Sequence, residues 1–331
     1  EPPSPLTFEE PMKISIVTPF YNEEDSLEEY FEAVEAVLTE YDYEIVCVED
    51  GSNDNTLIGL IKRQQESSRI RIVELSRNFG KEAALTAGLA ECHGDGIIII
   101  DADLQDPPSL IPSMIEKWKG GADVVLAQRR SRDSDSFMKR LSAEWFYKIY
   151  NKFADQPIPE NVGDFRLMDR KVVDIVNSLG ESNRFMKGIL SWPGFTAEFI
   201  EFDRPNRIAG ETKWNYRKLF QLSADGIFAF STVPLRLAMI IGLISSATAL
   251  VYAVYTIIKT ILSGIDVPGY ASLLVVSLTL SGIILICLGF IGEYLGRIYN
   301  EVKGRPIYVC LLYTSDAADD SLRVDLGGRR I

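Results

Sequence analysis

The stretch Gly96-Ile-Ile-Ile-Ile-Asp-Ala-Asp103 decides the fold, because an uncharged apolar run leads directly into two carboxylates. An apolar run without polar alternation predicts a strand that is buried on both faces, here Gly96–Asp101. Similar runs elsewhere predict four more strands, at Ile14–Thr18, Glu44–Glu49, Ile70–Leu75 and Asp123–Gln128.

Amphipathic stretches separate these strands and predict helices at Glu24–Thr39, Thr56–Glu66, Lys81–Cys92 and Ser109–Lys119. Alternation of strands and helices predicts an α/β domain with a mostly parallel sheet, and we place this domain at residues 13–213. Such sheets bind ligands at the carboxyl ends of their strands. Residues 1–12, rich in Pro and Glu, predict a loose leader that lacks the basic start and apolar run of a signal peptide.

Two uncharged stretches, Leu237–Ile258 and Ala271–Gly292, dominate residues 234–296. Each has about 22 residues and extends ~33 Å as a helix, enough to cross a hydrocarbon core of ~30 Å. A short turn at 264–269 joins them, which predicts a transmembrane hairpin. Basic residues flank its open end, and the positive-inside rule then places the α/β domain in the cytoplasm. A pair of buried core helices is the alternative interpretation.

The segments that flank the hairpin differ in character. Residues 214–233 mix aromatic and basic side chains, which favours an amphipathic helix at the membrane surface, with a linker helix packed on the domain as the alternative. Residues 297–309 are expected to form a cytoplasmic tail. Residues 310–331 resemble translated vector or adapter sequence, so we exclude them from the expected fold.

Charge and cysteine content exclude several classes of protein. The net charge of −13 over 331 residues argues against a nucleic-acid-binding protein. Basic residues nevertheless cluster at 129–140 and 204–218, as local anion sites or as solvated surface. The four cysteines have no metal-binding spacing, and His93, the only histidine, is expected at the surface. Catalysis by a Ser-His or Cys-His pair is therefore not expected.

Polar residues follow three of the predicted strands. Asp101 and Asp103 are two residues apart, so their carboxylates would share one face of a strand and could hold Mg²⁺ against a diphosphate. Asp50 and Gly51 follow a second strand, where a carboxylate could bind a base or ribose and a glycine allows a tight turn. Tyr21 follows the first strand and could stack on a base. Each loop alone fits ordinary turn chemistry, but three at successive strand ends favour a nucleotide pocket.

Several motifs in order resemble one family. They are Ile14-Ser-Ile-Val-Thr-Pro-Phe-Tyr-Asn-Glu23, Glu49-Asp-Gly-Ser-Asn-Asp54, Arg77-Asn-Phe-Gly-Lys81, Asp101-Ala-Asp-Leu-Gln-Asp-Pro-Pro108, Gly163-Asp-Phe-Arg-Leu-Met-Asp169 and Gly210-Glu-Thr-Lys-Trp-Asn-Tyr216. Together with the hairpin they resemble the polyisoprenyl-phosphate glycosyltransferases of glycosyltransferase family 2, of the dolichol-phosphate mannose synthase and bactoprenol glucosyltransferase type. The resemblance extends from about Lys13 to Val309.

The resemblance implies a GT-A fold, an inverting reaction and a role for each matched residue. It implies a nucleotide-sugar site at Pro19, Tyr21, Glu23, Asp50, Lys81 and Asp101. It implies that Mg²⁺ or Mn²⁺ is held by Asp101, Asp103 and Gln105, and that Asp164, with Arg166 beside it, occupies the catalytic position. It implies an acceptor-phosphate region at Arg129, Arg140, Ser142, Arg207 and Lys213. Glu49 departs slightly from relatives that have Asp or Asn there.

The resemblance also implies the substrates and the cellular setting. The donor would be a UDP-sugar, with UDP-glucose as the family-level expectation, and the acceptor would be polyprenyl (undecaprenyl) phosphate. The protein would be a multi-pass protein of the bacterial inner membrane that self-associates, for example as a tetramer. A phosphate monoester is already largely ionised at pH 7, so we hypothesise that Asp164 orients the acceptor or stabilises charge and is not a true base.

Two other functions would share features of this sequence. A processive polysaccharide synthase would share the nucleotide motifs, but such enzymes usually have a Q-x-x-R-W motif and more spans, and neither is found in this sequence. A non-catalytic membrane scaffold could keep the fold, but loss of the metal carboxylates would be expected, and Asp101 and Asp103 are both present.

Overall fold

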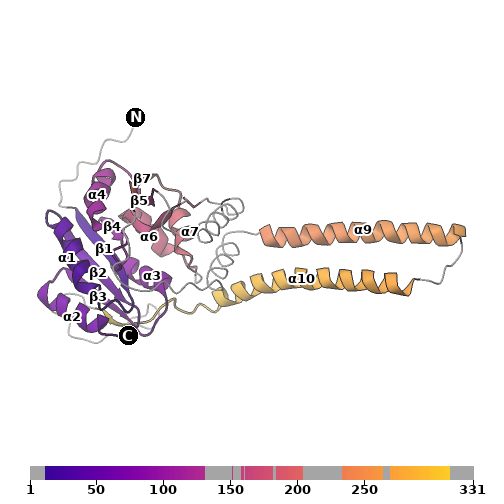
Figure 1. Cartoon of the computed structure of the whole chain (residues 1–331), viewed down its shortest axis with the longest axis horizontal. Coiled ribbons are helices and arrows are strands. Elements are labelled where there is room, and N and C mark those ends of the chain that lie inside the picture. The colour runs from indigo at the N-terminus through magenta and orange to yellow at the C-terminus, as the bar shows by residue number, and fades with distance from the viewer. Residues whose placement is uncertain are drawn as a thin grey trace.

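The computed structural model describes residues 12–130, 151, 158–159, 161–181, 184–203, 233–263 and 269–313 (Figure 1). The strands are β1 (Lys13–Phe20), β2 (Asp42–Glu49), β3 (Ile70–Leu75), β4 (Gly96–Ile99), β5 (Val124–Arg129), β6 (Val162–Asp169), β7 (Ala197–Phe202) and β8 (Cys310–Tyr313). The helices are α1 (Leu27–Leu38), α2 (Thr56–Glu66), α3 (Lys81–Glu91), the 3₁₀ turn η1 (Pro108–Leu110), α4 (Ile111–Lys119), α6 (Arg170–Ser178), α7 (Met186–Ser191), α9 (Val233–Ser263) and α10 (Tyr270–Val302).

The strands form one sheet in the order β7-β5-β6-β4-β1-β2-β3-β8. β6 runs antiparallel to its neighbours β4 and β5, and β8 runs antiparallel to β3, whereas the other pairs are parallel. The prediction of an α/β domain with a mostly parallel sheet is confirmed. The carboxyl ends of β1, β2 and β4 therefore lie at one edge of the sheet.

Helices cover both faces of the sheet, so the strands are apolar on both sides (Figure 1). On β1, Ile14 and Ile16 belong to a core with α1, α2 and α4, while Val17 belongs to a second core with α3, α6 and α7. The same alternation holds on β4, where Ile98 faces the first core and Ile97 faces the second. Because both faces are buried, the sequence of these strands has no polar alternation.

The end of β4 differs from the prediction. The strand stops at Ile99, and residues 102–104 form a turn in which Leu104 has a φ of 51°. Asp101 and Asp103 therefore approach one another through a turn and not through strand alternation. The predicted helix at Ser109–Lys119 also divides, because η1 precedes α4 and Pro112 lies in the first turn of α4.

The exclusion of all residues from Cys310 onward is wrong for Cys310–Tyr313. These four residues form β8, which pairs with β3 at the edge of the sheet. The amide of Ser76 also donates a hydrogen bond to the carbonyl of Val309 at 2.8 Å, and Cys310 is buried in the second core. The chain thus returns from α10 and covers the edge of β3, whose backbone groups would otherwise be open to pairing with another strand.

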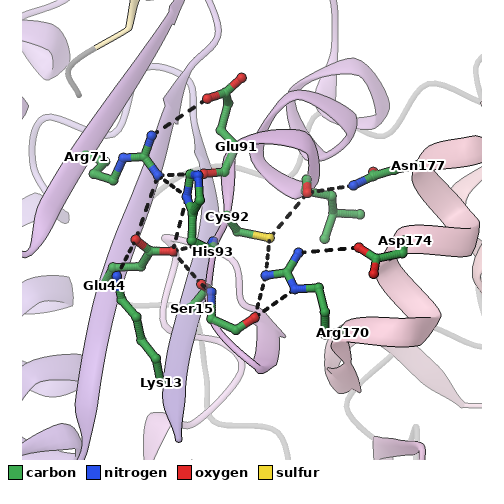
Figure 2. A network of polar contacts seen from close by, with 12 residues as sticks. Lys13, Ser15, Glu44, Arg71, Glu91, Cys92, His93, Arg170, Asp174 and Asn177 are labelled. Atoms are coloured by element: carbon green, nitrogen blue, oxygen red, sulfur yellow. Dashed lines mark hydrogen bonds and ion pairs between the residues drawn. The ribbon is translucent and has the colours of Figure 1, made fainter.

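A buried polar network lies at the opposite edge of the sheet, where strands β1, β2 and β4 begin (Figure 2). Glu44 accepts hydrogen bonds from Ser15 Oγ at 2.6 Å, Lys13 Nζ at 3.0 Å and the His93 amide at 2.6 Å. The His93 side chain is 62% exposed, so the expectation of a surface histidine is confirmed. This network joins β1, β2 and the loop before β4 at the edge of the sheet opposite the carboxyl ends of these strands.

Helices α9 and α10 form an antiparallel pair that extends away from the α/β domain (Figure 1). Their stretches Ala238–Lys259 and Thr279–Val302 are long and apolar enough to cross a membrane, and both are 0% buried. The alternative of buried core helices is therefore wrong. The second stretch lies further along α10 than the predicted Ala271–Gly292. The predicted turn at 264–269 falls almost wholly outside the described residues, as do the expected interfacial helix through residue 232 and residues 1–11 of the leader.

Candidate active site

A cavity of about 230 Å³ opens at the carboxyl edge of β1, β2 and β4. Its lining includes seven residues that the sequence singled out: Pro19, Tyr21, Glu23, Asp50, Lys81, Asp101 and Asp103. They come from the end of β1 and the loop after it, the loop after β2, the start of α3 and the turn after β4. Four strand connections that are distant in sequence therefore meet at one cavity, as parallel sheet topology requires.

Backbone hydrogen bonds hold the loop after β2 in place. The Asp50 carboxylate accepts the amides of Phe79 at 2.7 Å and Gly80 at 2.9 Å, which fixes the segment that leads into α3. Gly51 has a φ of +67°, and a Cβ there would lie 2.4 Å from the carbonyl carbon of Arg77. The prediction of a glycine-dependent turn is confirmed, and the close approach of the second loop is a further reason for glycine.

Glu49 stabilises the same turn. Its carboxylate accepts hydrogen bonds from the amides of Gly51 at 3.1 Å and Ser52 at 2.6 Å. The glutamate at this position, which departs from the family pattern, therefore caps the turn. The first two loops are joined because Asn22 accepts the amide of Asn53 at 2.8 Å. Tyr21 remains 43% exposed on this scaffold, so its ring face is accessible for stacking on a base.

Lys81, the first residue of α3, bridges two carboxylates. Its ammonium lies 2.6 Å from Asp164 Oδ2 and 2.7 Å from both oxygens of Asp101. It donates a hydrogen bond to Asp101 Oδ2, and Asp101 Oδ1 is buried without a well-directed hydrogen bond. Asp164, on β6, is thereby brought to the carboxylates that follow β4.

This arrangement separates the pKa values of the two carboxyl groups. Burial acts to raise the pKa of Asp164, but the positive charges of Lys81, Lys187 and Arg166 outweigh it and lower the pKa to about 2. For Asp101, burial and the nearby Asp164 charge together outweigh Lys81 and raise its pKa. Burial alone would lower the pKa of Lys81, but Asp164 and Asp101 raise it, so the lysine is firmly protonated. Asp164 is therefore a fixed anion.

The residues at the turn after β4 fit a divalent cation. Asp101 Oδ1 is a buried carboxylate oxygen that lies 2.7 Å from the Lys81 ammonium without a well-directed hydrogen bond, and carboxylate oxygens are the ligands that Mg²⁺ and Mn²⁺ prefer. Asp103 accepts the amide of Gln105 at 3.2 Å, which holds the turn closed. Within the described ranges no three His, Cys, Asp or Glu side chains form a ready-made site, so substrate phosphate would have to complete the ligand set.

Of the remaining predicted residues, only Arg166 and Arg129 lie in the part of the chain that the structure describes. Arg166 is buried, and it donates to the carbonyls of Gly163 at 2.9 Å and Asp164 at 3.3 Å, so it braces the backbone that presents Asp164. Arg129 lies beside Gly163, since a Cβ there would be 3.7 Å from its Nη2, and its buried Nε has no hydrogen-bond partner. Arg140, Ser142, Arg207 and Lys213 lie outside the described residues.

Several residues of the site were missed from the sequence. Asn78 and Gly80 line the cavity from the loop before α3. Asp106 is buried behind the turn, and burial together with Asp101 raises its pKa to about 6. Glu82 follows Lys81 and lies beside Asp164, and burial together with Asp164 raises its pKa to about 7. Asn78, Gly80 and Asp106 belong to the quoted motifs and could have been found there, whereas only the packing of α3 reveals Glu82.

Comparison with known proteins places this chain in a family. The model for glycosyl transferase family 2 matches residues 15–176, and the model for the GtrB C-terminal hairpin matches residues 233–298. A prophage bactoprenol glucosyl transferase homolog of Escherichia coli is 48% identical over 300 residues, covering 90% of this chain and 98% of that protein. The bactoprenol glucosyl transferase of Shigella phage SfII is also 48% identical, covering 90% and 97%.

Two further similarities were found. An uncharacterized glycosyltransferase of Synechocystis is 52% identical, covering 90% of this chain and 94% of that protein. The crystal structure of glucosyl-3-phosphoglycerate synthase from Mycobacterium tuberculosis with Mn²⁺ and UDP-glucose is more distant, at 21% identity and a TM-score of 0.46 over 66% of this chain and 77% of that one. Both family models match this chain, and its relatives match along nearly their whole length. The chain therefore belongs to glycosyl transferase family 2, in the group that has the GtrB C-terminal hairpin.

Proposed function

We propose that this enzyme transfers glucose from UDP-glucose to the phosphate of polyprenyl (undecaprenyl) phosphate, with inversion at the anomeric carbon. The observation that carries the proposal is the meeting of the predicted nucleotide residues and the Lys81–Asp101–Asp164 cluster at one cavity. The relatives named bactoprenol glucosyl transferase, which match along 97% or 98% of their own length, support the choice of sugar and lipid.

On the donor side, the loops after β1 and β2 bind the nucleotide. Tyr21 offers an exposed ring face to the base, while Pro19 and Glu23 line the wall of the cavity beside it. Asp50 acts on the nucleotide through the loop that it holds, because its oxygens already accept two backbone amides. Lys81 lies where the diphosphate would enter, so its ammonium can bind a phosphate oxygen.

A divalent cation, Mg²⁺ or Mn²⁺, would be held by Asp101, Asp103 and Gln105. When bound, it would neutralise the charge that develops on the departing diphosphate. The buried Oδ1 of Asp101 supports this assignment, because it receives no well-directed hydrogen bond and already lies 2.7 Å from a positive charge, the Lys81 ammonium. Lys81 contributes a second positive charge on the same side, and it stays protonated because of its two carboxylate partners.

On the acceptor side, a phosphate oxygen of the lipid attacks the anomeric carbon from the face opposite the diphosphate, while the bond from that carbon to UDP breaks. We assign the lipid phosphate to Arg129, Arg140, Ser142, Arg207 and Lys213. Asp164 acts as a fixed anion that orients the acceptor or stabilises positive charge on the sugar, because a carboxyl group with a pKa of about 2 is a poor proton acceptor.

The hairpin associates the enzyme with a membrane and so brings the site to its lipid substrate. We propose a multi-pass protein of the bacterial inner membrane whose catalytic domain faces the cytoplasm, as the basic residues beside the hairpin indicate. We further propose self-association through α9 and α10, for example as a tetramer. The apolar groove of about 630 Å³ between these helices supports an interface within the membrane.

The test is transfer of radiolabelled sugar to undecaprenyl phosphate in detergent, from UDP-glucose and a panel of other UDP- and GDP-sugars. We expect lipid-phase label from UDP-glucose alone, and only when Mg²⁺ or Mn²⁺ is present. Label from another donor would contradict the choice of sugar. A folded sample that binds UDP but labels no lipid would contradict the reaction itself.

A further inference from the structure

One hydrogen bond joins the start of α3 to the start of α7. Glu82 Oε2 accepts the backbone amide of Met186 at 3.0 Å, across 104 residues of sequence. Met186 is the first residue of α7, and Phe185 before it provides no side-chain cap. The Glu82 carboxylate therefore satisfies an amide that the helix itself leaves unpaired.

The two helix starts are packed together around this bond. Met186 is 1% exposed and belongs to the same core as Leu85 and Leu89 of α3. Thr86 lies one turn after Glu82, donates to the Glu82 carbonyl at 2.8 Å and contacts Met186 Sδ at 4.0 Å. These contacts hold the start of α7 against the start of α3, which carries Lys81 of the active site.

The neighbours of these two residues are both lysines that act on Asp164. Lys81 precedes Glu82 and pairs with Asp164 at 2.6 Å. Lys187 follows Met186, and its positive charge helps to lower the pKa of Asp164. The bond between Glu82 and Met186 therefore links the starts of the two helices that carry these lysines.

A neutral acceptor could satisfy the Met186 amide at lower cost. A partly buried carboxylate near the anion Asp164 is unfavourable, and burial and Asp164 raise the pKa of Glu82 to about 7 despite the bond from the Met186 amide and the charges of Lys81 and Lys187. A carboxylate whose charge is unfavourable, as that of Glu82 is beside the active site, indicates a role in function more than in stability.

We propose that Glu82 is a positioning residue for the transfer reaction: through its bond to Met186 it holds α7 against α3 and so places Lys81 and Lys187 around Asp164. Glu82 acts through its neighbours and not on the substrate. The inference rests on the proposed glycosyl transfer for its kinetic readout, and on the hydrogen bond itself for a readout that is independent of activity.

The experiment compares Glu82→Ala and Glu82→Gln with Asn177→Ala in the full-length enzyme. Asn177 is the matched control, because its side chain donates to the Leu89 carbonyl at 2.9 Å and so ties α6 to the other end of α3. We measure kcat, the KM for UDP-glucose, the pH profile, the melting temperature and amide exchange of the peptide that contains Met186.

We expect Glu82→Ala to lower kcat about tenfold or more, as loss of a hydrogen bond to a buried group predicts, with little change in KM. The peptide of α7 should exchange faster in this variant and not in Asn177→Ala. Glu82→Gln should retain most of the activity, because its amide oxygen can still accept the Met186 amide. It should also lose any titration near pH 7 that comes from Glu82.

Three results would overturn the inference: unchanged kcat in Glu82→Ala, an equal loss in Glu82→Gln, or unchanged exchange of α7. If Glu82→Ala does not fold, two other single variants test the inference. They are Glu82→Gln and Lys187→Met, each compared with the unaltered enzyme by its kcat and pH profile. Lys187→Met should lower kcat, and unchanged kcat there would contradict the role of the second lysine. Absence of transfer by the unaltered enzyme would contradict the proposed function. The amide exchange of α7 would still test whether the Glu82–Met186 hydrogen bond holds α7 against α3.

Discussion

The charge of Asp164, and not its ability to take up a proton, should account for its contribution to the rate. Its pKa of about 2 lies below the ordinary value of 3.8, so the group stays ionised at every pH at which the enzyme can be assayed. Replacement by Asn removes the charge and keeps the shape. If the residue were a general base, its pKa would be expected near the working pH.

The size of the effect follows from the charge that Asp164 would face. A sugar carbon with about half a positive charge, ~4 Å from a carboxylate, gains ~2 kcal/mol at an effective dielectric constant of ~20. That energy corresponds to about thirtyfold in rate. Lys81, at 2.6 Å, already neutralises part of the charge, so a loss much larger than this would point to a change in structure. We therefore expect Asp164→Asn to lower kcat about thirtyfold.

The assay is lipid labelling from UDP-glucose between pH 5.5 and 9. The unaltered enzyme and Asp164→Asn should share the same acid limb near pH ~6, where the lipid phosphate titrates. Glu82→Gln is run beside them, since the pKa of Glu82, about 7, falls in the same window. Asp174→Asn, an exposed change on α6, is the control for the loss of a carboxylate. Recovery of Asp164→Asn activity at high pH would refute the reasoning and establish a base.

Three more predictions follow from single contacts. Asp101→Asn should lower transfer at least about a hundredfold and weaken its dependence on Mn²⁺ in a metal titration, because Asp101 Oδ1 is the assigned cation ligand. Gly51→Ala should reduce the free energy of unfolding by about 1–3 kcal/mol and weaken UDP binding, because its Cβ would lie 2.4 Å from the Arg77 carbonyl carbon at a positive φ. Glu44→Gln should cost about 1–3 kcal/mol at pH 7, measured by denaturant unfolding. Burial raises the pKa of Glu44, but bonds from Ser15, His93 and Lys13 lower it below 4.5, so the difference should persist at neutral pH and shrink as pH falls below about 4.5. A constant difference down to pH 3 would contradict the last assignment.

Much of the fold could be predicted because both faces of the strands are buried. Runs such as Ile97–Ile100 leave no polar face, so they predict central strands between layers of helices, and the layers are found on both sides. The helix Thr56–Glu66 was predicted with its observed bounds, since its amphipathic pattern starts and stops sharply. The nucleotide loops could be placed together because parallel strands bring their carboxyl ends to one edge.

Strand order and tertiary pairing could not be predicted in the same way. β6 lies between β4 and β5 and runs antiparallel to both, and no local pattern in Val162–Asp169 encodes that direction. β8 is a second example, because Cys310–Tyr313 pairs with the edge of β3, and four residues alone do not show which strand they will pair with. In both cases the information lies in residues distant along the chain.

The charge balance of the site shows why motif spacing alone was incomplete. Asp101 and Asp103 suggest a doubly acidic metal site, yet Lys81 and Asp164 enter the same cluster from α3 and β6. Counting the carboxylates of Asp101, Asp103 and Asp164, the ammonium of Lys81 leaves two net negative charges in the cluster. A divalent cation at Asp101 and Asp103 would neutralise them, and the cluster would then no longer repel the donor diphosphate. Metal and donor should therefore bind cooperatively, with Lys81 free to turn from Asp101 to a phosphate oxygen once the cation shares that carboxylate.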